Sequence, residues 1–259
     1  FSPITQTTSW TGALSASWNE SANWTNGIPD AGKTAVITVQ TLQPEINLTA
    51  TTGDLVLQPT AELSVKSAGQ LTVHGNLLLK SSVEGTATVL NDGLMQVEGT
   101  STVKQLLTAS TTAVAGDQWW YVSSPVTGAT SAVILQEGSG NRMGYYNEAT
   151  ARYPQLTSGT EVLESGRGYL AEIGTTNLYR FIGTLNNGDI GPLSLSRTLT
   201  AGASGGFNLV GNPYPSYINW NSVTAFGTPQ QRADIRPTIW IRTRNASGSM
   251  VFDTLDRKS

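Results

Sequence analysis

The sequence of 259 residues contains no cysteine, so disulfide bonds, thiolate metal sites and cysteine nucleophiles are all excluded. It contains a single histidine, His74, so a histidine-based metal site is not expected, and a Ser-His-Asp triad would have to use this one residue. Charged residues make up only 13% of the chain, against about 25% in average proteins. The net charge of −3 leaves no basic excess, and nucleic-acid binding is therefore not expected.

No apolar run approaches the length of a membrane-spanning helix, and the first residues lack the basic and apolar regions of a signal peptide. We therefore expect no transmembrane segment, and we expect that any signal peptide has already been removed. The composition is instead rich in Thr, Ser, Gly and Asn, which is typical of all-β extracellular proteins. A cysteine-free, threonine-rich secreted chain fits a bacterial surface protein better than a secreted eukaryotic domain.

Short pairs of apolar residues, separated by one residue, recur between positions 36 and 104. Such a pair is typical of a short strand, because alternate side chains of a strand point to the same side. Gly, Pro, Asn or Asp occupies many of the intervening segments, as expected for turns. The pairs are Ile37/Val39, Ile46/Leu48, Leu55/Leu57, Leu63/Val65, Leu71/Val73, Leu77/Leu79, Ala87/Val89 and Met95/Val97, followed by the single Val103.

Taken three at a time, these pairs repeat about every 24 residues, which is the arithmetic of a parallel β-helix with three strands per turn. An antiparallel sandwich with strands about every 8–10 residues is the alternative. No Gly-Gly-x-Gly-x-Asp repeat is present, so a calcium-filled β-roll is not supported. For the β-helix we predict three vertical stacks of side chains, namely Ile37–Leu63–Ala87, Ile46–Leu71–Met95 and Leu55–Leu77–Val103.

Three tryptophans, Trp10, Trp18 and Trp24, stand among Asn, Ser and Thr before this repeat. The open end of a β-helix must be covered, because an exposed strand edge recruits other chains. We predict that the three rings cap the first turn, and an aromatic platform for sugars is the alternative. A structural calcium ion would lie in the turns between Asn19 and Asp30, but no other feature of the sequence supports such a site. No other cofactor is expected.

Residues 108–259 form a second region of aromatic-rich strands separated by Gly, Asn and Pro turns. We predict an antiparallel β-sandwich of the jelly-roll type, with a hairpin turn at Asn187-Gly188. The stretch 106–116 is the expected linker or strand exchange, and a single helical turn is expected at residues 221–226. The predicted fold class is all-β, with a capped parallel β-helix at 1–107 followed by this sandwich, which we expect to be truncated at its C-terminus.

Four segments of the chain carry a family resemblance. They are SWTGALSASWNESANWTNGIPDAGKTAVI (9–37), the Leu-Thr-Val-His-Gly-Asn-Leu run (71–77), WWYVSSPV (119–126) and GFNLVGNPYPSYINWN (206–221). They resemble recurrent blocks, in this order, of large secreted proteins of the Bacteroidetes, and the last block is the most specific. The resemblance implies export through the outer membrane, usually by the type IX secretion system, and residence on the cell surface. The sorting domain of this route is absent here, so either it lies beyond residue 259 or the route is a different one.

The best binding candidates are the consecutive aromatic residues Trp119, Trp120 and Tyr121. In a strand, Trp119 and Tyr121 share one face and Trp120 takes the other, so at least one ring should point outward or into an interdomain contact. Exposed rings stack on sugars or contact a partner protein, and core packing is the alternative. A separate signal, Asp253-Thr254-Leu255, resembles the O-glycosylation signal of exported proteins of that phylum, which makes Thr254 the expected modification site.

The sequence assigns no catalytic residue. His74 is expected on the outward face of its strand, as a solvated surface residue. Ser124 lacks both the Gly-x-Ser-x-Gly elbow and a nearby histidine. A pair of acids would serve a glycosidase, but no local motif holds any two of them at the required distance. The acids considered are Asp117, Glu161, Glu164 and Glu172.

Together these features predict a non-enzymatic segment of a secreted cell-surface protein with a structural or adhesive role, exported by the type IX system. The alternatives are a carbohydrate-binding module and part of a polysaccharide-degrading surface enzyme. We expect cell-surface or secretion-machinery proteins as partners, with glycans as the other class of ligand. The expected location is the outer surface of the cell.

Overall fold

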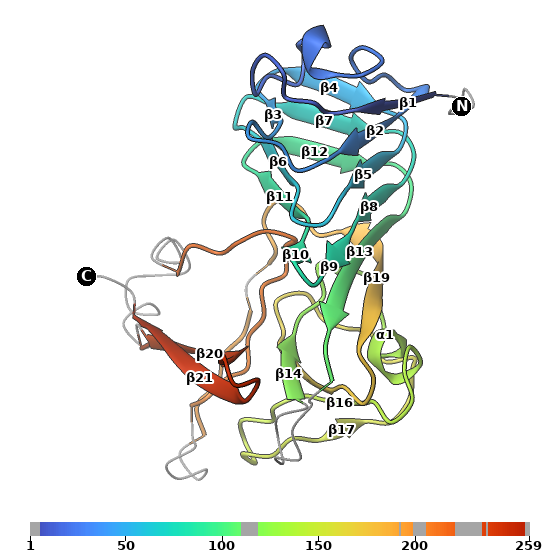
Figure 1. Ribbon diagram of the computed structural model, residues 1–259. Coiled ribbons are helices and arrows are strands. Elements are labelled where there is room, and N and C mark those ends of the chain that lie inside the picture. Colours follow the sequence, from blue (N-terminus) through green and yellow to red (C-terminus); the bar gives the residue numbers. More distant parts are fainter. Residues whose placement is uncertain are drawn as a thin grey trace.

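The structure is a computed structural model that describes residues 6–109, 119–191, 193–198, 206–220, 235–236 and 238–256. The regular structure is nearly all β, with 43% strand and 4% helix. Stacked parallel strands form one end of the molecule, and antiparallel strands form the other (Figure 1). The all-β fold class and the parallel β-helix that the repeat predicted are both confirmed.

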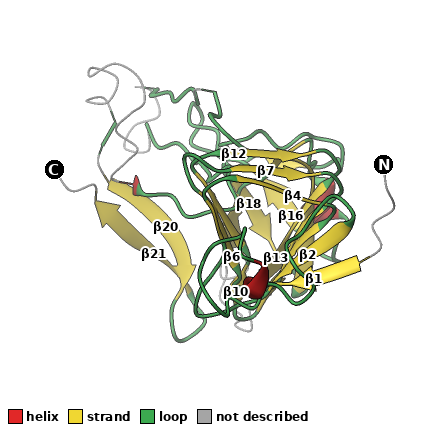
Figure 2. Cartoon of the chain, turned by 90° about the horizontal axis from the view of Figure 1, so that it is seen from above, coloured by secondary structure: helices red, strands yellow, loops and turns green. Residues whose placement is uncertain are grey.

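The β-helix has about four turns, and its strands form three parallel sheets around a central core (Figure 2). The first sheet contains β1 (Gln6–Ser9), β2 (Lys33–Ile37), β5 (Leu55–Leu57), β8 (Leu77–Leu79) and β13 (Ser101–Leu107). The second sheet contains β3 (Glu45–Ile46), β6 (Glu62–Val65) and β11 (Thr88–Asn91). The third sheet contains β4 (Thr49–Thr52), β7 (Gln70–Val73) and β12 (Leu94–Val97).

Apolar residues of successive turns stack on one another inside the β-helix. In the first sheet, the register aligns Ile37 with Leu57, and it continues through Leu79 to Val103. All four side chains are buried, because alternate residues of each strand point inward. Burial of one such side chain contributes about 1.5–3 kcal/mol. A single turn has nothing above or below to bury against, so the stacking itself holds the turns together.

The predicted vertical stacks are correct only in part. Leu71 and Met95 are neighbours as expected, but Ile46 lies beside Val65 instead of Leu71. The difference arises at β4, whose sequence TATT contains no pair of large apolar residues and was therefore not recognised as a strand. Its two inward-facing side chains are buried all the same. Between Ile37 and Leu55 the chain therefore forms two strands, β3 and β4, where the apolar pairs indicate only one.

The other two predicted stacks also need correction. Ile37 lies in the first sheet, whereas Leu63 lies in the second sheet next to Val89, so these two do not stack. In the last turn, Ser101 takes the place that was expected for Val103. The first correction follows from β4, because this additional strand places Leu55 in the first sheet and Leu63 in the second. The second correction arises because β13 already begins at Ser101, so that Val103 aligns with Leu79 within the same sheet.

The tryptophan cap is confirmed at the N-terminal end of the β-helix. Trp10, Trp18 and Trp24 are all buried, with at most 5% of their surface exposed. Their rings meet edge to face, at centroid distances of 5.1 Å for Trp10–Trp24 and 4.7 Å for Trp18–Trp24. The indole of Trp10 donates to the Leu42 carbonyl at 2.7 Å, and that of Trp24 donates to the Trp18 carbonyl at 2.8 Å. The first turn is therefore closed by three packed rings, and hydrogen bonds fix the orientation of two of them, Trp10 and Trp24.

The last turn runs into the second region through one continuous sheet. β13 pairs in parallel with β8 over its first three residues, and it pairs antiparallel with β19 (Asn177–Leu185) over all seven. The end of β19 pairs with β15 (Val126–Thr127). The first sheet therefore extends beyond the β-helix, and the expected boundary at 107/108 coincides with the end of β13.

The second region is built from antiparallel strands, as predicted. A four-stranded sheet has the order β14 (Trp119–Val122), β18 (Tyr169–Glu172), β16 (Arg142–Gly144) and β17 (Gln155–Leu156). β20 (Thr238–Arg244) and β21 (Met250–Asp256) form a separate hairpin. The small elements are η1 (Ser21–Asn23), the pair β9 (Ser81–Ser82) and β10 (Gly85–Thr86), and α1 (Ala132–Leu135). The helical turn expected at 221–226, and most of the expected linker at 106–116, lie outside the described residues.

One prediction for this region is wrong. Asn187-Gly188 does not join two paired strands, because no described strand pairs with β19 on the far side of this turn. Gly188 does adopt a positive φ of 66°, so a turn forms at the expected place. Asn187 instead reaches the last turn of the β-helix, as described below.

Candidate functional site

The three consecutive aromatic residues lie in β14, and their side chains alternate as a strand requires. Trp120 packs against the hydrophobic core, and its indole donates to the Thr108 carbonyl at 2.9 Å. Trp119 and Tyr121 contact other groups on the opposite side, and each is only partly exposed. The three rings therefore do not form one continuous platform.

The β20–β21 hairpin covers Tyr121. Arg242 donates from Nε to the Trp119 carbonyl at 3.1 Å. Its guanidinium lies 5.9 Å from the ring centroid of Tyr121 and 5.3 Å from that of Phe252, which are cation–π distances. The rings of Tyr121 and Phe252 are 5.9 Å apart. These contacts attach the hairpin to the four-stranded sheet, and β20 and β21 lie at one side of the molecule in Figure 2.

A second arginine covers Trp119. The guanidinium of Arg142 lies 5.5 Å from the Trp119 ring centroid. Arg142 also forms an ion pair with Glu172. In the sheet register, Glu172 lies opposite both Trp119 and Arg142. The hydrogen bond and the charge of Glu172 raise the pKa of Arg142. We call Trp119, Tyr121, Arg142, Arg242 and Phe252 the aromatic–arginine cluster.

The phenol of Tyr121 is held in its neutral form. Burial is the main cause that raises its pKa, and the neighbouring Tyr153 adds to the effect through its charge and a hydrogen bond. The positive charge of Arg242 acts in the opposite direction and is the smallest of these causes. At neutral pH, Tyr121 is therefore a hydrogen-bonding group and an apolar surface, and it does not serve as a phenolate nucleophile.

The outward aromatic surface lies beside this cluster, on residues that the sequence analysis did not single out. Trp240 is 43% exposed and Phe207 is 48% exposed, and their rings meet edge to face at 5.4 Å. Thr254 is exposed and lies directly opposite Trp240 in the hairpin register. The alternation in TIWIRTR was the available signal, because it places Trp240 on the same face as Arg242.

The remaining candidate side chains are separated, and each has a local partner. His74 lies on the β-helix with Nδ1 3.0 Å from Glu98 Oε2. Ser124 is buried and donates to the Val126 carbonyl at 2.6 Å. The structure describes three of the four candidate acids, and Asp117 lies outside the described residues. The partners are Ser131 for Glu161, Arg167 for Glu164 and Arg142 for Glu172.

The turns proposed for calcium are held by protein groups. Asp30 accepts from the Gly32 amide at 2.9 Å and pairs with Lys33 at 3.1 Å, and these contacts lower its pKa. Asn19 donates to the Thr49 carbonyl at 3.2 Å. Within the described parts of the chain, no three His, Cys, Asp or Glu side chains come together as a metal site would require.

Two further observations concern the chain as a whole. No helix in the described ranges has the length and apolar character needed to cross a membrane. A sequence profile for a family described as "Domain of unknown function (DUF8693)" matches residues 9–254. Comparison with curated proteins and with solved structures gave no match.

Proposed function

The chain belongs to the DUF8693 family, and we propose that it is a non-enzymatic segment of a secreted cell-surface protein that holds and presents a contact surface. The proposal assigns a structural role to the β-helix and an adhesive role to the aromatic hairpin. It also includes export by the type IX secretion system, which the resemblance to secreted proteins of the Bacteroidetes supports.

The β-helix supports the structural part of the proposal. Its N-terminal end is closed by the buried cap of Trp10, Trp18 and Trp24. At its other end, β13 pairs along its full length with β19 of the second region. Stacked turns that are covered at one end and continuous with a second region at the other form a stiff spacer.

The exposed pair Trp240 and Phe207 is the observation that carries the adhesive part. Monomeric proteins rarely expose contiguous apolar patches, and aromatic residues are enriched where proteins make contacts. Phe252, which is 51% exposed, extends this surface on the neighbouring strand. The contacts of Arg242 attach the hairpin to β14 on this same face, so that Trp240 lies beside a fixed support.

A bead-adhesion experiment tests this role. Beads coated with the chain are incubated with intact cells of the producing bacterium, and bound beads are counted. We expect Trp240→Ala to reduce binding at least about fivefold, which corresponds to the loss of about 1 kcal/mol of contact energy. Leu14→Ala is the matched control, because Leu14 is 64% exposed on the N-terminal cap. Wild-type binding no higher than that of albumin-coated beads would rule out the adhesive role.

A carbohydrate-binding module is the second candidate, and the same exposed rings favour it. Indole and phenyl faces stack on the apolar faces of sugars, and Trp240 has nearly half of its surface available. A glycan-array screen with Trp240→Ala in parallel separates the two roles. Reproducible binding to one glycan class, lost in the variant, would favour the sugar-binding role. Release of reducing ends from a polysaccharide panel would instead contradict the non-enzymatic proposal.

Modification of Thr254 belongs to the same proposal. Its hydroxyl lies on an exposed strand residue, and its neighbours Asp253 and Leu255 are exposed as well. Mass spectrometry of the protein from its native host is expected to find a glycan on the peptide that contains Thr254. Thr254→Ala is expected to remove that mass, and an unmodified peptide from surface-exposed wild-type protein would contradict the assignment.

A further inference from the structure

The last turn of the β-helix exposes three strand edges toward the second region, and they are covered to different extents. β13 is paired with β19 over seven residues. β11 receives a backbone bond, in which the Val89 amide donates to the Pro215 carbonyl at 2.9 Å. β12 is the outermost strand of its three-stranded sheet. From the described residues it receives one side-chain bond, from Asn187 to the Met95 carbonyl.

The outward backbone groups of β12 follow from its register with β7. The amides of Leu94 and Glu98 donate back toward β7, to the Gly69 carbonyl at 3.0 Å and the Val73 carbonyl at 2.9 Å. In a parallel ladder the intervening odd-numbered residues, Met95 and Val97, direct both N–H and C=O away from that neighbour. Asn187 uses the Met95 carbonyl, so three outward groups of β12 have no partner within the described chain.

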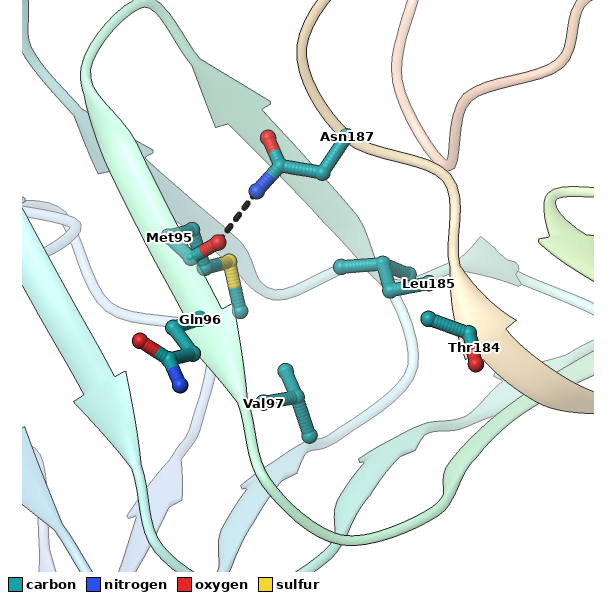
Figure 3. Close-up of a pocket in the computed structure, with 6 residues that line it drawn as sticks. All are labelled: Met95, Gln96, Val97, Thr184, Leu185 and Asn187. Atoms are coloured by element: carbon teal, nitrogen blue, oxygen red, sulfur yellow. Dashed lines mark hydrogen bonds between the residues drawn. The ribbon is translucent and has the colours of Figure 1, made fainter.

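A groove runs along this open edge. A cavity of about 230 Å³ lies between β12 and the end of β19, with Val97 on one side and Leu185 on the other (Figure 3). A second hollow of about 350 Å³ continues it over the outer face of β7 and β12. The two hollows share Met95, Gln96 and Asn187, so they adjoin along β12. No charged side chain lines either hollow.

We propose that this groove, the β12 groove, binds an extended peptide segment of a partner protein as a fourth strand beside β12. The N–H and C=O groups of Val97 and the N–H of Met95 point away from β7. They have the spacing at which the backbone of an added strand forms hydrogen bonds. Figure 3 shows Val97 and Leu185 on opposite sides of the cavity. A cavity of about 150 Å³ accommodates benzene, so this larger one accepts an aliphatic or aromatic side chain.

The lining also defines the chemistry of the partner segment. A charged side chain would lose hydration in a groove that offers it no counter-charge. We therefore assign an uncharged segment, with an apolar side chain over Leu185 and a polar side chain next to Gln96. The backbone bonds supply affinity, and the alternation of side chains supplies specificity.

The test uses a displayed library of random peptides of about nine residues as the probe, selected against the whole chain. Thr184→Trp blocks the groove, because Thr184 is an exposed lining residue. Ile182→Trp is the matched control, since Ile182 lies on the same face of β19 and outside the groove lining. Val97→Pro is the second blocking variant, because it removes one outward donor at an edge where proline is tolerated.

We expect enriched peptides that alternate apolar and polar residues and bind the wild type and Ile182→Trp equally. Binding to Thr184→Trp and to Val97→Pro is expected to be at least about tenfold weaker, with each variant folded by circular dichroism. Hydrogen exchange at the Met95 and Val97 amides is expected to slow when an enriched peptide binds.

Three results would overturn the proposal. The first is a selection that gives no peptide preferring the wild type over Thr184→Trp. The second is unchanged exchange at Met95 and Val97 in the presence of an enriched peptide. The third is protection of those amides by a pool of neutral oligosaccharides, lost in Thr184→Trp, which would assign the groove to a glycan.

Discussion

The side chain of Asn186 donates a hydrogen bond to the Ser124 carbonyl at 3.1 Å and so joins two loops that are 62 residues apart in the chain. The same amide group donates to the Pro213 carbonyl at 2.9 Å. Its oxygen accepts from the Thr127 hydroxyl at 2.7 Å. Asn186 is only 4% exposed, so one buried side chain satisfies two backbone carbonyls that water does not reach.

Asn186→Ala is therefore expected to destabilise the protein by about 2–4 kcal/mol, because each buried carbonyl left without a donor costs about 1–3 kcal/mol. Urea denaturation measures the change. Asn19→Ala is the matched control, since Asn19 is exposed and makes one bond to the Thr49 carbonyl. The control should lose less than about 1 kcal/mol. Equal losses in the two variants would show that Asn186 does not hold the loops.

Removal of one tryptophan from the cap is expected to destabilise the β-helix. Trp24→Ala removes the ring that contacts both Trp10 and Trp18, and it is expected to cost about 3–5 kcal/mol in unfolding free energy. Because the first strands lose their cover, self-association is also expected and is measurable by light scattering. Leu14→Ala, in the same segment, should change stability by less than about 0.5 kcal/mol. A monomeric, fully stable Trp24→Ala variant would contradict the capping role.

The turn before β12 needs glycine. A Cβ on Gly93 would lie 2.3 Å from the Lys66 carbonyl oxygen and 2.4 Å from that of Gly69, both of which belong to the turn below. Gly93→Ala is therefore expected to cost about 1–3 kcal/mol, because the stacked turns must move apart. Gly191→Ala, where the Cβ would meet open space, is the control and should leave the melting temperature nearly unchanged. Similar melting temperatures for the two variants would refute the close approach of the turns.

The stability of the protein is expected to depend on pH through the carboxylate of Glu148. Its carboxylate accepts from the Thr198 and Gly206 amides, each at 2.7 Å, and these bonds lower its pKa to about 2. A carboxylate whose pKa is lowered by folding stabilises the protein above its unfolded pKa, and this contribution is lost as the pH falls toward the folded value.

The pH prediction is checked by comparing Glu148→Gln with the wild type in thermal melts. At neutral pH the variant should melt at a lower temperature, because a neutral amide accepts these bonds less strongly. The difference should shrink between about pH 4.5 and pH 2, where the wild-type carboxylate becomes protonated. A difference that stays constant over this range would show that the carboxylate charge does not hold the segment.

The strengths and limits of the sequence prediction are visible in the β-helix. Pairs such as Leu55 and Leu57 marked their strands correctly, because inward residues must alternate along a strand. Val39 and Leu48 looked equivalent, but they are 54% and 66% exposed because their strands end earlier. A strand such as β4, with small inward side chains, gave no apolar signal at all.

The candidate site likewise combines a feature that the sequence predicts with one that it does not. The alternation that separates Trp120 from Trp119 and Tyr121 was predictable, since it depends only on strand geometry. What covers those rings was not, because Arg242 is 123 residues from Trp119 in the chain. No single-sequence pattern connects positions so far apart.

The sequence by itself determined the all-β class, the short repeating strands and the cap of buried tryptophans. These features follow from local alternation, turn residues and the need to bury apolar side chains. The tertiary structure alone decided which strands share a sheet, how the hairpin meets β14 and where the β12 groove lies. Those outcomes depend on the length of each turn and on long-range contacts such as that between Asn187 and Met95, 92 residues apart, which form only when the chain folds.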